Sequence, residues 1–246
     1  MRRLLSVLLL AALPVAAQPP GRLPAGTLPG LGADDARHPV PLAEAPWRAL
    51  GRVQTELGSR CTGALVAPDL VLTAAHCLVS PRARGLVRPG TVHFMLGYDR
   101  GAAVAHARVA AYRVAPGFRA DPAGPPPVDW AVLMLDRPIG APDRVLPLLR
   151  RPPAPRTPLM LGGYQQDRPE VLLADTGCRA IGLVGMQGGP PMLAHDCAGT
   201  RGASGAPVLA RGEDGRWGIA GIVSVMLADA AMGLAVPAAA VRLPGR

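Results

Sequence analysis

The sequence contains no lysine and no asparagine, and aromatic residues make up only 3% of it. All 26 basic residues are therefore arginines, and the formal net charge is +9. No basic run is interleaved with aromatic residues, so we expect no nucleic-acid partner and interpret the charge as dispersed over a solvated surface. Because aromatics are so few, any core must be built mainly from leucine, valine and alanine, with methionine filling gaps.

Long apolar runs are missing beyond the start of the chain. Residues 1–17 combine two arginines, an apolar run too short to cross a bilayer, and small residues at Val15 and Ala17. This pattern predicts a signal peptide that is cleaved after Ala17, and hence export to the periplasm or the exterior. We expect no membrane span in the rest of the chain.

Cysteine is also scarce, and no C-x-x-C motif occurs. In an exported protein, the four cysteines indicate disulfides, for which three pairings exist. No set of cysteines and histidines has the spacing of a zinc site, so we expect no metal. The one alternative, ligation by His195 and the cysteines near it, is disfavoured by the same spacing.

Short apolar segments separated by Pro, Gly and Asp clusters follow a Pro- and Gly-rich lead-in at residues 18–46. Such segments predict an all-β chain, and the Pro68-Asp69 pair predicts a hairpin turn. A Pro- and Arg-rich linker at 150–158 separates a first β-barrel at 47–149 from a second at 159–246. The first series of segments is Ala49–Val53, Gly63–Val66, Leu70–Thr73, Val92–Leu96, Ala107–Val114 and Trp130–Leu135. The second series is Leu159–Leu161, Cys178–Leu183, Met192–His195, Pro207–Leu209, Gly218–Val225 and Gly233–Val236.

Three motifs contain candidate catalytic residues. They read T-A-A-H-C at residues 73–77, D-W-A-V-L at 129–133 and G-A-S-G-A-P at 202–207. A serine hydroxyl is a poor nucleophile unless an imidazole accepts its proton and a carboxylate holds that imidazole in the right tautomer. The motifs supply such a set in Ser204, His76 and Asp129. Asp136, which ends the apolar segment after Asp129, competes for the role of the carboxylate.

The three motifs resemble those of trypsin-like serine peptidases with the chymotrypsin fold, in particular the secreted bacterial branch, over roughly residues 46 to 240. The resemblance implies two packed six-stranded antiparallel barrels with the active site in the cleft between them. It also implies a secreted serine endopeptidase that cleaves protein or peptide substrates through an acyl-enzyme, needs no cofactor and acts as a monomer. It selects Asp129 over Asp136.

Further roles follow from the resemblance. It assigns the oxyanion-binding N–H groups to Gly202 and Ser204, and it assigns to Ser224 a hydroxyl that supports the carboxylate of Asp129. Together with proximity in the sequence, it favours two disulfides, one that joins Cys61 to Cys77 and one that joins Cys178 to Cys197.

Two positions depart from the animal digestive enzymes. Those enzymes have an aspartate before the nucleophile that pairs with a freshly cleaved amino terminus, whereas this chain has Ala203. We therefore expect the chain from Gln18 onward to be active without a further cut. Where trypsin-like specificity needs a buried aspartate, this chain has Ala198.

The remaining pocket wall aligns with Val223, Val225 and Met226 beside Ser224. An apolar pocket narrowed by a thioether favours small or medium uncharged side chains before the scissile bond. Asp229 is the one nearby acid that would instead attract a basic side chain.

Two rival functions remain. One is a catalytically silent relative that serves as a binding protein, which a covalent fluorophosphonate probe would expose. The other is an esterase-like hydrolase that uses the same triad, which a matched amide and ester would distinguish.

Overall fold

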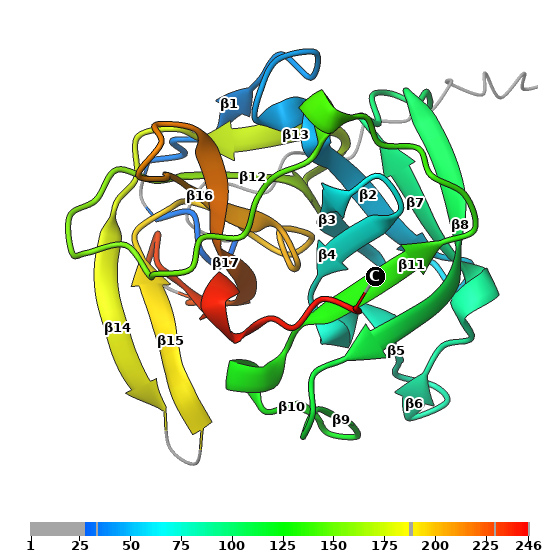
Figure 1. The fold of residues 1–246 in the computed structure, drawn as a ribbon. Coiled ribbons are helices and arrows are strands. Elements are labelled where there is room, and N and C mark those ends of the chain that lie inside the picture. Colours follow the sequence, from blue (N-terminus) through cyan, green and yellow to red (C-terminus); the bar gives the residue numbers. More distant parts are fainter. Residues whose placement is uncertain (1–27, 33, 187–188, 229, 246) are drawn as a thin grey trace, which may run out of the picture.

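The structure is a computed structural model that describes residues 28–32, 34–186, 189–228 and 230–245. Its regular elements are strands and short 3₁₀ helices, and the strands form two assemblies that lie side by side (Figure 1). The signal peptide predicted for residues 1–17 lies outside the described residues. Among the described residues, no helix is both long and apolar enough to cross a membrane.

The first assembly is a closed barrel with the strand order β11-β4-β3-β2-β7-β8. Its strands are β2 (Leu50–Thr55), β3 (Arg60–Ala67), β4 (Leu70–Thr73), β7 (Val92–Leu96), β8 (Ala105–Val114) and β11 (Ala131–Leu135). Each apolar segment of the first series matches one of these strands, with only Ala49 and Trp130 just outside, and β3 and β4 form the predicted hairpin. Two small hairpins project from this half of the chain: β5 (Val79–Ser80) with β6 (Gly85–Leu86), and β9 (Arg119–Ala120) with β10 (Ala123–Gly124).

The second assembly is an eight-stranded antiparallel sheet with the order β1-β13-β12-β16-β17-β18-β15-β14. Its strands are β1 (His38–Pro39), β12 (Met160–Gln165), β13 (Arg168–Asp175), β14 (Ala180–Met186), β15 (Gly189–His195), β16 (Pro207–Arg211), β17 (Trp217–Met226) and β18 (Gly233–Pro237). The expected all-β architecture of two assemblies is confirmed. The second has eight strands instead of the expected six, because β1 and β13 add to the six strands that correspond to the apolar segments of the second series.

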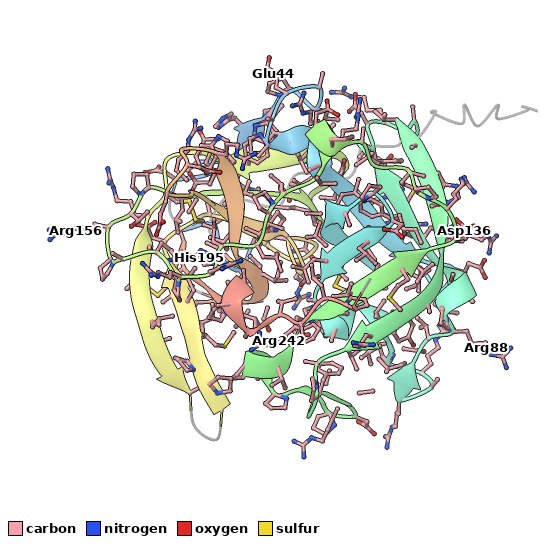
Figure 2. All side chains as sticks on the ribbon, viewed as in Figure 1. Glu44, Arg88, Asp136, Arg156, His195 and Arg242 are labelled. Atoms are coloured by element: carbon pink, nitrogen blue, oxygen red, sulfur yellow. A yellow bond between two sulfur atoms is a disulfide. The ribbon has the colours of Figure 1, made fainter. Side chains whose placement is uncertain are left out.

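Both cores consist largely of buried leucine, valine and alanine, as the scarcity of aromatics predicts. Phe94 and Tyr164 are the largest side chains among the fully buried ones. Charged side chains such as Arg88 and Arg156 project at separate points of the periphery (Figure 2). Residues 150–158, all of which the structure describes, contain no strand and connect the two assemblies.

The lead-in packs against the second assembly, which the sequence did not predict. Leu28 is 5% exposed and Leu31 is 1% exposed, so both bury their side chains. Strand β1 pairs with β13 in an antiparallel register that places His38 opposite Ala174. The Pro and Gly content of residues 18–46 predicts an extended, partly mobile segment, but its described part is anchored by burial and strand pairing.

Thr62 of β3 joins the two assemblies. Its backbone N–H donates to the Ser204 carbonyl at 2.9 Å, and its hydroxyl donates to the Gly202 carbonyl at 2.9 Å. The hydroxyl oxygen in turn accepts from the Tyr164 N–H at 2.9 Å. One side chain of the first barrel therefore fixes the turn that carries Ser204 and the strand β12 of the second sheet.

Candidate active site

His76 lies in a 3₁₀ helix, Ala75–Leu78, that begins just after strand β4. Ala75, Cys77 and Leu78 are buried, whereas the His76 side chain is 30% exposed. The disulfide from Cys77 to Cys61 ties this helix to strand β3. The imidazole is thus the one side chain of the helix that faces outward from a rigid support.

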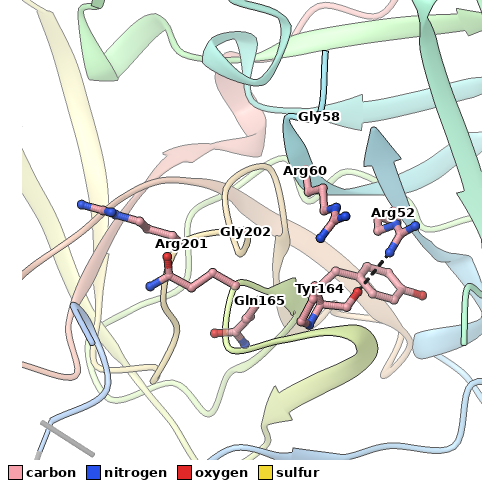
Figure 3. A pocket seen from close by; sticks show the side chains of 9 residues that line it. Arg52, Gly58, Arg60, Tyr164, Gln165, Arg201 and Gly202 are labelled. Carbon is pink, nitrogen blue, oxygen red and sulfur yellow. Dashed lines mark hydrogen bonds between the residues drawn. The ribbon is translucent and has the colours of Figure 1, made fainter. Parts of the chain in front are cut away.

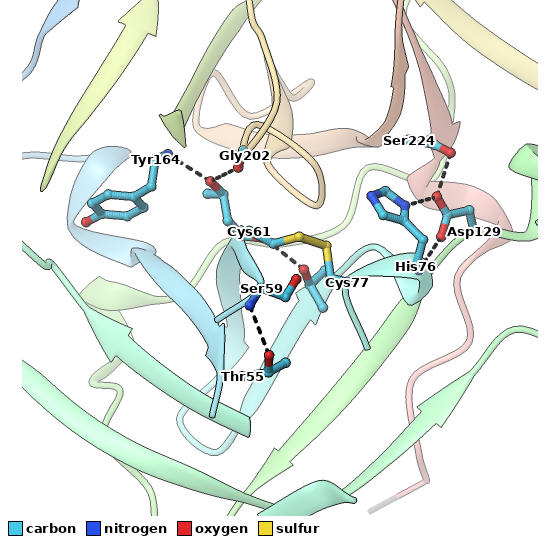
Figure 4. Close-up of a disulfide and its surroundings, with 11 residues drawn as sticks. Thr55, Ser59, Cys61, His76, Cys77, Asp129, Tyr164, Gly202 and Ser224 are labelled. Atoms are coloured by element: carbon cyan, nitrogen blue, oxygen red, sulfur yellow. Dashed lines mark hydrogen bonds and ion pairs between the residues drawn. A yellow bond between two sulfur atoms is a disulfide. The ribbon is translucent and has the colours of Figure 1, made fainter. Parts of the chain in front are cut away.

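The buried carboxylate of Asp129 binds His76 and orients its imidazole. Its carboxylate is 4% exposed and lies just before strand β11. Oδ1 accepts the backbone N–H of His76 at 2.8 Å, and Oδ2 lies 2.6 Å from His76 Nδ1 (Figure 4). Because a carboxylate at neutral pH only accepts hydrogen bonds, Nδ1 carries the proton and Nε2 has a free lone pair.

Ser224 supports the same carboxylate from the second assembly. Its hydroxyl donates to Asp129 Oδ2 at 2.6 Å from strand β17 (Figure 4). Asp129 therefore accepts three hydrogen bonds, which offset the cost of burying a charged group. The structure thus brings His76, Asp129 and Ser224 together.

Ser204 lies in a turn between the two assemblies. Its carbonyl accepts from Thr62, and the next N–H, that of Gly205, donates to the Val223 carbonyl at 2.9 Å. Gly205 has φ of +76°, and a Cβ on it would lie 2.2 Å from Thr73 Oγ1 and 2.8 Å from the Ala74 nitrogen. Only glycine fits this close approach, which places the Ser204 turn against the segment that leads into His76.

Gly202 is held under similar constraint on the other side of Ser204. Its φ is +93°, and a Cβ would lie 2.3 Å from the Tyr164 carbonyl oxygen. In the described part of the chain, no backbone carbonyl accepts from the N–H of Gly202 or of Ser204. These are the two N–H groups to which the sequence assigns the binding of an anionic oxygen.

Of the four residues that the sequence assigns to a substrate pocket, Ala198 lies in the loop that leads to Ser204, and Val223, Val225 and Met226 lie in strand β17. Ala198 and Val223 are 1% exposed, while Val225 and Met226 are partly exposed. A methyl group on Gly199 would lie 3.5 Å from Met226 Cε, so the thioether packs against this loop. Asp229 lies outside the described residues.

No donor set for a metal emerges from the cysteines in the described residues. Two groups of potential ligands occur, Cys61 with His76 and Cys77, and Cys178 with Asp196 and Cys197. In each group both cysteines form a disulfide, so neither group offers the thiolate that zinc prefers.

His195 is buried in the second assembly, with its Nδ1 accepting from the Cys197 N–H at 3.3 Å (Figure 2). Its Nε2 has no partner among the described residues. Burial lowers the pKa of His195 to about 4, so the ring is neutral near pH 7. The other histidines outside the site lie on or near the surface, and the rings of His93 and His106 stack.

Sequence reasoning missed the groups that hold the loop from 198 to 203. The Ala198 N–H donates to Asp175 Oδ2 at 2.9 Å, and the Thr200 N–H donates to Gln165 Oε1 at 2.7 Å. Gln165 also accepts from Arg37 at 2.8 Å. None of these residues belongs to a motif, and their partners are distant in the sequence, so no local signal identifies them.

Comparison with known proteins agrees with this geometry. The sequence matches the Trypsin family over residues 36–242. No curated protein matches the chain. Among solved structures, one described as a Glu endopeptidase in complex with MPD is similar in fold, with a TM-score of 0.70 and 21% identity, and the match covers 85% of this chain and 93% of that chain. The chain therefore belongs to the Trypsin family of serine peptidases.

Proposed function

We propose that the protein is an exported serine endopeptidase in which Ser204 is the nucleophile. The observation that carries the proposal is the Asp129 carboxylate, which binds both His76 and Ser224. That arrangement leaves His76 Nε2 as a base at the surface, beside the turn of Ser204. Family membership and the two available N–H groups near Ser204 support the same chemistry.

The reaction follows from these positions. Ser204 Oγ attacks the carbonyl carbon of the substrate peptide bond while His76 Nε2 takes the hydroxyl proton. The negative charge that develops on the carbonyl oxygen is stabilised by the N–H groups of Gly202 and Ser204. His76 then returns its proton to the leaving amine, and an acyl-enzyme remains on Ser204. Water, activated by His76 in the same way, hydrolyses that ester and restores the enzyme.

A covalent probe tests this assignment. A fluorophosphonate should label the wild-type protein at Ser204, and Ser204→Ala should remove both labelling and nearly all peptidase turnover. The residual rate should be only about 10³–10⁴ times that of water, from the oxyanion-binding groups and substrate binding. Ser59→Ala is the matched control, because Ser59 is partly exposed and lies away from Asp129. A protein that is not labelled would be a binding protein, and one that cleaves an ester but not its matched amide would be an esterase.

The pocket supports a preference for small or medium uncharged side chains before the scissile bond. Its walls are apolar, and His195, which lies with Met226 against Gly233, is neutral because burial lowers its pKa to about 4. No fixed positive charge from this ring therefore attracts a glutamate, and Ala198 offers no negative charge to an arginine. A peptide library should show cleavage after alanine, valine or leucine, whereas cleavage confined to sites after glutamate, arginine or lysine would refute this preference.

A further inference from the structure

The described lead-in contacts the loop from Ala198 to Ala203 directly. The Gly199 N–H donates to the carbonyl of Gly30 at 3.0 Å. Leu31, the next residue, is 1% exposed, so this part of the lead-in is embedded in the second assembly. The loop that presents Gly202 and Ser204 is therefore bounded on one side by a segment that precedes both barrels.

Arg37 supplies the strongest connection. Its side chain is fully buried and uses all five of its N–H donors. Nε and Nη2 bind the two carboxylate oxygens of Asp35 at 2.8 and 2.9 Å. Nη1 and Nη2 bind the two carboxylate oxygens of Asp167 at 3.0 and 2.8 Å. The fifth donor, on Nη1, binds Gln165 Oε1 at 2.8 Å.

Gln165 relays this contact to the loop. It is fully buried, and its Oε1 accepts from Arg37 and, at 2.7 Å, from the Thr200 N–H. Its neighbour Gln166 donates its N–H to the Arg201 carbonyl at 2.8 Å, and the Thr200 carbonyl accepts from Ala203 at 2.9 Å. Figure 3 shows Gln165 beside Gly202, at the wall of a hollow of about 190 Å³ that Arg201 also lines.

We propose that Arg37 is a positioning residue for catalysis: through Gln165 it fixes the Thr200 N–H and so holds Gly202 and Ser204 in the geometry that binds the developing oxyanion. Ala203 is fully buried and carries no charge, so no ion pair at that position holds the loop. Arg37 holds the loop instead, from within the chain, and no new amino terminus is needed. The inference rests on the proposed function, since it concerns the oxyanion-binding groups of that site.

Arg37→Met tests the proposal, because methionine keeps most of the length of the side chain and removes every donor. We expect kcat to fall by about tenfold to hundredfold with little change in KM, because the substrate pocket remains and only the transition-state donors move. Labelling by a fluorophosphonate should slow by a similar factor. All assays are run well below the unfolding temperature of the variant, which is measured in parallel.

A readout that is independent of activity is amide hydrogen exchange in the peptide that spans residues 198–206. Exchange there should be faster in Arg37→Met than in the wild type. Arg48→Met is the matched control, because Arg48 is partly buried and pairs with Asp143 at 3.2 Å, away from this loop. That control should lose some stability but keep both kcat and the exchange rate.

A second pair of variants keeps the test decisive if Arg37→Met folds poorly. Gln165→Glu keeps an oxygen that accepts from Arg37 and Thr200, whereas Gln165→Met removes it. Both variants lose the long hydrogen bond that Gln165 Nε2 donates to the Leu173 carbonyl at 3.5 Å, so this loss is matched between them. We expect the glutamate variant to retain most of kcat and the methionine variant to lose it. Equal kcat values in this pair, or wild-type exchange in Arg37→Met, would overturn the positioning role. If the wild type is not labelled, the proposed function fails, and the exchange data still decide whether Arg37 holds the loop.

Discussion

The two halves of the active site are held in place by different means. His76 and Asp129 belong to the first barrel, and three hydrogen bonds to a single carboxylate, together with the Cys61–Cys77 disulfide, fix them. The loop that carries Ser204 belongs to the second assembly, and it is held by groups from the lead-in, from strands β12 and β13 and from Thr62 of the first barrel. The histidine half therefore depends on one central contact, whereas the serine half depends on several that are spread along the chain. Loss of the Asp129 carboxylate should therefore disable the first half. Loss of any one side chain that supports the Ser204 loop should only weaken the second half.

The substitution Asp129→Asn tests this difference between the two halves most directly. Both carboxylate oxygens accept, Oδ1 from the His76 backbone N–H and Oδ2 from His76 Nδ1 and Ser224. An amide has only one accepting oxygen, and if the backbone N–H keeps it, the NH2 group faces Nδ1. The imidazole then loses the tautomer that leaves Nε2 as a base. We expect kcat to fall by about 10³–10⁴, far more than for Arg37→Met. Asp136→Asn, at the exposed end of the same strand, is the matched control and should be nearly silent. Similar losses for Asp129→Asn and Arg37→Met would show that the two halves do not differ as described.

The sequence predicts the histidine half well and the serine half poorly, and the difference is physical. The strands of the first barrel are short apolar segments with clear turns, and their local pattern is sufficient to locate them. Strand β13 begins with Arg-Pro-Glu, which looks like a turn, and β1 has only two residues, so neither is visible as an apolar segment. The Arg37–Gln165 contact joins positions 128 residues apart and involves polar side chains whose burial no local pattern reveals.

The sequence identifies the proposed triad because its motifs combine small residues, a cysteine and the reactive groups in one fixed order. The position of Ser224 followed only from the resemblance, since a serine in an apolar strand has no special meaning by itself. The described lead-in shows the limit of composition as a guide. Its Pro and Gly content indicates a loose segment, yet Leu31 and Arg37 are enough to anchor it.

Acid should destabilise the folded protein through His195, which is buried in the second assembly. His195 is neutral in the folded protein with a pKa of about 4, while an unfolded histidine titrates near 6.5, so the unfolded state binds more protons in this range. Stability is then fully present above about pH 6.5 and falls as the pH drops, by about 3 kcal/mol at pH 4. Hydrogen bonds from Arg37 lower the pKa of Asp35, which adds a further loss as the pH falls below its ordinary value.

Urea unfolding at pH 7.5 and pH 4 measures this effect in the wild type and in His195→Leu. The leucine variant cannot titrate at this position, so its loss of stability between the two values should be smaller by about 3 kcal/mol. His38→Gln, at an exposed position, is the control and should behave as the wild type does. An identical pH dependence in all three proteins would exclude His195 as the source of acid lability.

Shortening the chain separates the contribution of the lead-in from that of the two barrels. Proteins that begin at residues 18 and 28 should have the same kcat, since neither lacks Leu31 or Arg37. A protein that begins at residue 38 should lose about tenfold or more in kcat, because the loop before Ser204 then lacks Gly30 and Arg37. The kinetics of the three purified proteins on one peptide substrate measure this. If the shortest protein had the same kcat as the others, the serine half would not depend on the lead-in. If the longest protein were inert until cut within residues 18–46, the prediction that the chain from Gln18 is active without a further cut would be wrong.

The smallest expected effect comes from Ser224, whose hydroxyl reaches from the second assembly to Asp129. Ser224→Ala removes one of the three hydrogen bonds that Asp129 accepts and leaves the two from His76 in place. A typical hydrogen bond contributes about 1 kcal/mol net, and Asp129 keeps both hydrogen bonds from His76, so kcat should fall by only roughly threefold to tenfold with KM nearly unchanged. Ser224→Thr keeps the hydroxyl and should restore most of the rate. In a double variant with Arg37→Met, the two losses of activation free energy should add, so the two fold-changes in kcat should multiply. The reason is that Ser224 contacts Asp129 whereas Arg37 contacts Gln165, and they share no hydrogen-bond partner. If the double variant loses much less than the product of the two factors, Arg37 and Ser224 act on the same element, and the active site behaves as one unit instead of two halves with separate supports.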